Sequence, residues 1–233
     1  MTKILASSLA LILAASGAQA VELLGANAGL SYGKMTEAPF NNFEKTQLEA
    51  SAEVGFAPSL SVQGDIALTA LTRANRDADS YGLHAIYNTN ADLAVGAFAA
   101  YDDVQGYDIS SYGVEVAGRA SGVAYEAYIG RTDDDKKIGE LFGLSAQIDL
   151  IEEAKMGLRY DNIDLGAART ERLSLTGEYK ATSDITLTAE LGKMRVNEAN
   201  SEPFFTIGAK WNFGGKAAPT FKQRNVMAIV PGL

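Results

Sequence analysis

The sequence contains no cysteine, one histidine and one tryptophan in 233 residues, and only five prolines. Without cysteine, the stability of the chain cannot depend on disulfides. There is also no cysteine–histidine cluster or EF-hand spacing, so we expect no metal site and no cofactor. Beyond residue 20 there is no long uninterrupted apolar run, which argues against a transmembrane helix. The formal net charge of −9 argues against nucleic acid as a partner.

The first twenty residues have the three parts of a secretory signal peptide. Lys3 supplies the positive start, residues 4–15 form the apolar region, and Ala18-Gln19-Ala20 is a small-residue cleavage site. The apolar region is too short for a membrane-spanning helix. We therefore expect an exported chain that is cleaved after Ala20.

The clearest positive signal is the alternation in residues 204–213, whose sequence is FFTIGAKWNF. Apolar side chains occupy every second position, at Phe205, Ile207, Ala209, Trp211 and Phe213. A period of two predicts a β-strand with one apolar face. A length of about ten residues is also what a tilted strand needs to cross the hydrocarbon core of a bilayer.

Eleven earlier segments repeat this pattern, so we predict an all-β chain of twelve antiparallel strands. The predicted strands cover residues 24–34, 47–56, 60–72, 81–88, 93–102, 112–119, 123–131, 141–149, 154–161, 172–180, 185–194 and 204–213. Turns of three or four residues alternate with longer polar loops, such as 35–46 and 103–111. This asymmetry is typical of up-and-down outer-membrane barrels, which have short periplasmic turns and longer external loops.

A closing strand that ends in aromatic residues resembles the last strand of Gram-negative outer-membrane barrels, and the mature chain is similar to a small porin. The resemblance implies a transmembrane β-barrel over residues 21–213 in the cell outer membrane, with both termini in the periplasm. It also implies contacts with outer-membrane lipid and lipopolysaccharide, and insertion by the barrel-insertion machinery. A homo-oligomer would fit the family, but the sequence identifies no oligomer face.

Alternation alone does not say which face points outward, because a soluble barrel such as a lipocalin hides its apolar stripe inside. Aromatic residues of the apolar parity gather near strand ends, as interfacial girdles require. These residues are Tyr32, Tyr81, Tyr87, Tyr101, Tyr112, Tyr125, Tyr160, Tyr179, Trp211 and Phe213. The opposite face carries charges at mid-strand, so we predict that the apolar face meets lipid.

Charged residues of the other parity are expected to line the lumen and to set its selectivity. They are Glu49, Glu53, Asp65, Glu115, Arg119, Glu126, Lys155, Arg159, Lys180 and Lys210. Acidic residues come mostly from the early strands and basic residues from the late ones. Such a field could orient polar solutes, as in porin constrictions. Alternatively, the charges could pair with one another and close the lumen.

The only histidine, His84, has lumen parity and is the only histidine candidate for an enzymatic site. Barrel enzymes with histidine mechanisms need a serine or carboxylate within hydrogen-bond reach, and no motif here identifies a nucleophile. Asp102 and Asp103 form an acidic pair at a predicted loop edge, which is common in solvated loops. We therefore expect no enzymatic activity.

Residues 214–233 follow the predicted barrel and have no strand periodicity. Three interpretations are open: a disordered periplasmic tail, a plug folded into the lumen, or a contact for a periplasmic partner. The first is favoured by Gly214, Gly215 and Pro219. The expected function is passive transport of ions or small polar solutes through a channel. The alternative is a barrel with a closed lumen, which would serve as a structural or adhesive platform.

Overall fold

The computed structural model describes residues 22–37, 43–72, 76–134, 137–165, 168–197, 199–213 and 218–230. The predicted signal peptide lies outside these residues and stays a prediction. Within the described residues the chain forms twelve strands and one short helix. The strands are β1 (Glu22–Met35), β2 (Glu44–Ala57), β3 (Leu60–Leu71), β4 (Arg76–Asn90), β5 (Leu93–Val104), β6 (Asp108–Ala120), β7 (Val123–Asp133), β8 (Ile138–Ile151), β9 (Ala154–Asp164), β10 (Arg169–Lys180), β11 (Ile185–Val196) and β12 (Glu202–Phe213), and the helix is α2 (Val226–Ile229).

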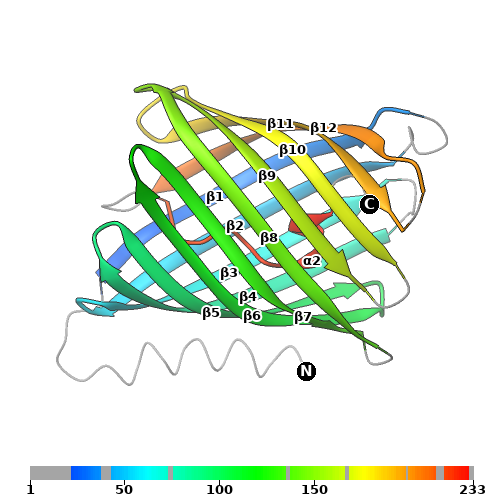
Figure 1. Cartoon of the computed structure of the whole chain (residues 1–233), viewed down its shortest axis with the longest axis horizontal. Coiled ribbons are helices and arrows are strands. Elements are labelled where there is room, and N and C mark those ends of the chain that lie inside the picture. Colours follow the sequence, from blue (N-terminus) through cyan, green and yellow to red (C-terminus); the bar gives the residue numbers. More distant parts are fainter. Residues whose placement is uncertain are drawn as a thin grey trace.

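Each strand pairs antiparallel with its neighbours in sequence, and β1 pairs with β12 to close the ring (Figure 1). The prediction of an all-β, up-and-down barrel with twelve strands is therefore confirmed. Closure leaves no unpaired edge, so the backbone N–H and C=O groups of the wall are satisfied within it. The described residues contain no helix of sufficient length and apolarity to span a membrane.

The strands begin or end close to the predicted residues at the short turns but extend further at the long loops. For example, the predicted loop 103–111 is reduced to residues 105–107, because β5 continues to Val104 and β6 begins at Asp108. In such extensions the apolar alternation stops while backbone pairing continues, as between Asp103 and Asp108. The sequence pattern therefore shows only the part of each strand that would face lipid.

The outer face of the barrel is apolar, as predicted. Leu30, Val114, Ile129, Leu158 and Leu191 are each more than half exposed on it. The predicted girdle aromatics have the same outward parity and divide between the two ends of the wall. Tyr32, Tyr81, Tyr101, Tyr112 and Tyr160 lie toward the long loops, and Tyr87, Tyr125, Tyr179, Trp211 and Phe213 lie toward the short turns. An apolar band between two aromatic girdles is typical of a transmembrane barrel.

Residues 218–230 do not form the disordered periplasmic tail that the sequence favoured, because they are bonded to the wall of the barrel. Figure 1 shows residues 218–230 running inside the barrel, from the end with the short turns toward the end with the long loops. We call these residues the lumen segment. Eight of the ten residues from Phe221 to Val230 are buried, because the wall offers both apolar and charged partners. Residues 214–217 and 231–233 lie outside the described part of the chain.

Candidate functional site

The ten predicted lumen residues alternate with the outward apolar residues and so have inward parity. The structure brings some of them together. Glu49 on β2 and Lys210 on β12 meet across β1, with 3.1 Å between Lys210 Nζ and Glu49 Oε1. Gly29 lies between them, and a Cβ at this position would lie 3.1 Å from the same carboxylate oxygen. The missing side chain therefore lets this pair form.

Three predicted lumen residues lie near the short turns and away from the rest. Arg119 Nη1 donates to Asp149 at 2.8 Å, and Lys155 Nζ lies 3.9 Å from the same carboxylate. The side chains of Arg119, Asp149 and Lys155 are each at least 40% exposed. Lys180 is exposed at the end of β10. These charges border the mouth of the lumen and do not touch the buried cluster described next.

The lumen segment is held by side chains from several strands. Thr220 N donates to Glu53 Oε2 at 2.7 Å, and Phe221 exchanges two hydrogen bonds with the Gln63 amide. Val226 N donates to Asp102 Oδ2 at 2.8 Å. Further toward the long loops, Lys45 Nζ donates to Met227 O at 2.5 Å and to Val230 O at 2.7 Å. Because buried polar groups need partners, these bonds fix the path of the segment.

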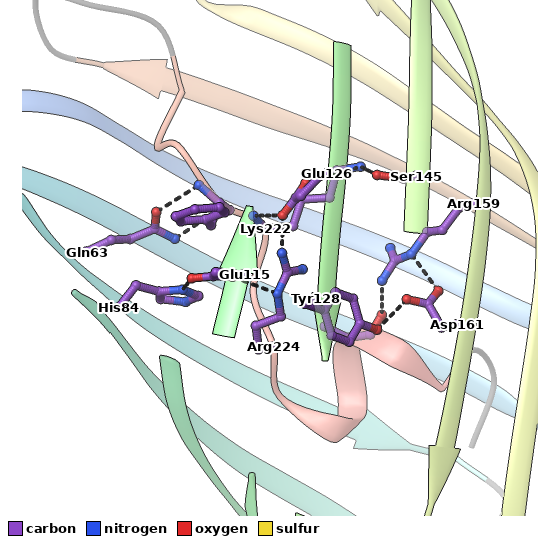
Figure 2. Close-up of polar contacts among 12 residues, drawn as sticks. Gln63, His84, Glu115, Glu126, Tyr128, Ser145, Arg159, Asp161, Lys222 and Arg224 are labelled. Atoms are coloured by element: carbon purple, nitrogen blue, oxygen red, sulfur yellow. Dashed lines mark hydrogen bonds and ion pairs between the residues drawn. The ribbon is translucent and has the colours of Figure 1, made fainter. Parts of the chain in front are cut away.

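The middle of the segment is an arginine enclosed by three wall residues, as Figure 2 shows. Arg224 Nε donates to Glu115 Oε2 at 2.9 Å, and its Nη2 donates to Glu126 Oε1. Its Cζ lies 4.2 Å from the centre of the Tyr128 ring. The Arg224 side chain is 2% exposed. We call Glu115, Glu126 and Tyr128 the cation box, since two carboxylates and an aromatic face surround one planar cation.

His84 stands next to the cation box and is bound on both ring nitrogens. Its Nδ1 lies 2.6 Å from Glu115 Oε1 and its Nε2 lies 2.8 Å from Asp65 Oδ2. Both nitrogens can donate to ionised carboxylates only in the imidazolium form. The Phe221 ring stacks on the imidazole, with 6.0 Å between centroids and 13° between planes. His84 is therefore a buried structural cation of the wall.

A second charge cluster lies on the other side of Tyr128. Asp161 accepts from Tyr128 Oη at 2.5 Å, from Arg159 Nε at 2.8 Å and from Arg172 Nη2 at 2.6 Å. The carbonyl of Ala228 lies 3.3 Å from Arg172 Nη1, so the same cluster also contacts the segment. Tyr128 thus connects the cation box to the basic side of the lumen.

Near the long loops the inner face becomes apolar. Val226, Met227, Ile229 and Val230 of the segment pack there against inward side chains of many strands, among them Met35, Leu71, Phe98, Ile109, Leu141, Ile163, Met194 and Phe204. Asp102 was predicted at the end of a strand, on the edge of a solvated loop, but it is fully buried within β5, where Ser80 Oγ donates to it at 2.5 Å. This belt closes the loop end of the lumen around α2.

Two recesses lie beside the segment. The cavity lined by Lys222, Arg224 and Asp161 has a volume of about 10 Å³, close to that of a single water probe. A larger recess of about 200 Å³ lies at the short-turn end, between Asn88, Arg119 and Thr220. The apolar belt fills the loop end of the lumen, whereas the side chains of Lys222 and Lys210 further inside stay 44% and 39% exposed.

Several residues of this site were missed by sequence reasoning. Tyr128 carried a signal, since it departs from the outward parity of most tyrosines. Lys45, Gln63 and Asp161 have inward parity but no motif. Lys222 and Arg224 belong to a segment whose sequence does not show what it contacts.

Comparisons with known proteins identify the fold. No family model and no curated protein matches the sequence. Among solved structures, the KdgM porin superposes with a TM-score of 0.63 at 8% identity, covering 80% of this chain and 99% of that chain. The COG4313 outer membrane channel from Pseudomonas putida F1 gives 0.58 at 12% identity, over 82% of this chain and 96% of that chain. The fold is porin-like. The NanC porin agrees, with a TM-score of 0.58 at 8% identity over 80% of this chain and 98% of its own.

Proposed function

We propose that this protein is an outer-membrane porin-like channel for passive diffusion of ions or small polar solutes, and that its lumen segment closes it. The observation that carries the proposal is a closed ring of strands with an apolar outside and a charge-lined inside. A wall of this kind separates lipid from a polar interior. The KdgM porin has been solved in complex with disordered oligogalacturonate, a polar solute.

The proposed placement follows from the chain order. Export by the signal peptide and an even number of strands put both termini in the periplasm, together with the short turns. The long loops then face outward, where their acidic residues could meet lipopolysaccharide. The lumen segment would enter the barrel from the periplasmic end.

We propose no chemical step. The only histidine uses both ring nitrogens for Asp65 and Glu115, and its side chain is 1% exposed beneath Phe221. A general base must reach the proton that it takes from a substrate. His84 has no such access in the described structure, and its partners are carboxylates instead of a nucleophile.

The filled loop end of the lumen favours a second candidate, a closed barrel that acts as a structural or adhesive platform. The two can be separated with a full-length variant that loosens the segment, Phe221→Ala with Arg224→Ala. If the protein is a gated channel, the variant should give frequent conductance steps in planar bilayers, whereas the wild type should give few. If neither protein conducts, although both run as folded barrels on unheated gels, the channel proposal is rejected and the closed barrel is favoured.

A further inference from the structure

We propose that the cation box is a binding site for a guanidinium-bearing solute, and that Arg224 is its built-in competitor. The inference rests on the proposed function, because a solute would meet the box only as it enters the lumen. It assigns to that lumen a class of ligand, planar organic cations.

The wall around the cation box carries an excess of negative charge. On the wall, the carboxylates of Asp65 and Glu115 are paired with His84. Arg159 lines the same cavity as Glu126 but is paired with Asp161, so it does not offset the charge of the box. The lumen segment supplies the rest of the positive charge. Arg224 bonds Glu115 and Glu126, and Lys222 Nζ lies 3.9 Å from Glu126 Oε2. When the segment leaves, the wall keeps an excess of negative charge that requires a cation.

The shape of the cation box fits a planar cation. The two carboxylates are reached by different nitrogens of one guanidinium, Nε and Nη2, while its flat face lies over Tyr128. A guanidinium offers donors in a rigid plane and stacks on aromatic rings, whereas an ammonium is a compact, strongly hydrated point charge. The box therefore favours guanidinium over a simple amine.

The cation box is formed by residues of the wall alone. Glu115 on β6 is the register partner of Tyr128 on β7, and Glu126 lies two residues before Tyr128. Tyr128 is fixed by its hydrogen bond to Asp161, and its ring lies over Gly143, where a Cβ would come within 2.2 Å of it. His84 fixes Glu115. A site held by rigid strands is prepared for a ligand before the ligand arrives.

The test uses the full-length Phe221→Ala, Arg224→Ala variant in detergent and titrates it with agmatine by calorimetry. Agmatine should bind the variant at least tenfold more tightly than the wild type, whose box is filled. Putrescine, which has an ammonium in place of the guanidinium, should bind more weakly than agmatine. Equal agmatine affinity for the variant and the wild type would overturn the proposal, since Arg224 would then not compete for the site.

Two further substitutions in the same variant locate the site. Glu126→Gln and Tyr128→Leu should each weaken agmatine binding by about tenfold, which is about 1.4 kcal/mol. Glu49→Gln is the matched control, because Glu49 pairs with Lys210 away from the box, and it should leave the affinity unchanged. Unchanged affinity in Glu126→Gln would place binding elsewhere. Binding without conductance would reject the channel and retain the box, and conductance without binding would do the reverse.

Discussion

At the scale of single residues, Asp161 holds two guanidinium groups and a phenol at once. Its carboxylate is 1% exposed and accepts hydrogen bonds from Arg159, Arg172 and Tyr128. Charged groups inside a barrel are tolerated only when such partners satisfy them. Removing this anion would leave Arg159 without its carboxylate partner and Arg172 with only Glu190, 3.7 Å away.

We therefore expect Asp161→Asn to lower the stability of the barrel strongly. Breaking a buried ion pair by removing one partner costs about 3–5 kcal/mol. The measurement is the unfolding midpoint in urea, followed by the gel shift between folded and unfolded barrel. Asp149→Asn is the control, because Asp149 is also paired with arginine but is 44% exposed, so its loss should change the midpoint little. Equal midpoints for the two variants would contradict the role given to Asp161.

At the scale of elements, the strands could be predicted and the lumen segment could not. Each strand alternates because one face meets an apolar phase and the other a polar one. Trp211 is exposed on the outer face, for example, whereas its neighbour Lys210 pairs with Glu49 inside. Lys222 and Arg224 have no such local pattern. Their partners, Glu115 and Glu126, are about a hundred residues away in sequence, and only barrel closure brings them together. Phe221 likewise finds its place only beside His84.

Gly96 of the wall leaves room for the Phe221 ring of the lumen segment. A Cβ at Gly96 would lie 2.8 Å from Phe221 Cε2, so Gly96→Ala should push Phe221 out of its place. Overpacking costs about 1–3 kcal/mol. A cost of about 1–2 kcal/mol would raise the population of molecules with a displaced segment by a factor of about 5–30. Trypsin should therefore cleave after Lys222 and Arg224 that much faster in the folded variant, as peptide mapping would show.

The control for Gly96→Ala is Gly177→Ala, since Gly177 also lies within a strand but a Cβ there would meet nothing within 4 Å. This variant should be cleaved at the wild-type rate. If Gly96→Ala were cleaved no faster than Gly177→Ala, Phe221 would not be what holds the segment beside His84.

At the scale of the whole molecule, the barrel is arranged with apolar residues outside and ion pairs inside. Leu158 and Arg159 are neighbours in sequence, yet the first is 60% exposed on the outer face and the second bonds Asp161 in the lumen. In water this arrangement would be unfavourable, because the apolar outer face would be hydrated while charges are buried. In a bilayer the same outer face contacts acyl chains.

Arginine substitutions at two depths test whether the outer face contacts lipid. Leu158 lies at the middle of β9, and Ile185 begins β11 at the short-turn end. Leu158→Arg should destabilise the barrel in lipid vesicles by about 2–4 kcal/mol, because arginine would lie near the bilayer midplane, whereas Ile185→Arg should cost about 0–1 kcal/mol near the interface. Reversible unfolding in guanidinium from vesicles measures both values. Equal costs would mean that the outer face does not cross the bilayer in the orientation that the two aromatic girdles define.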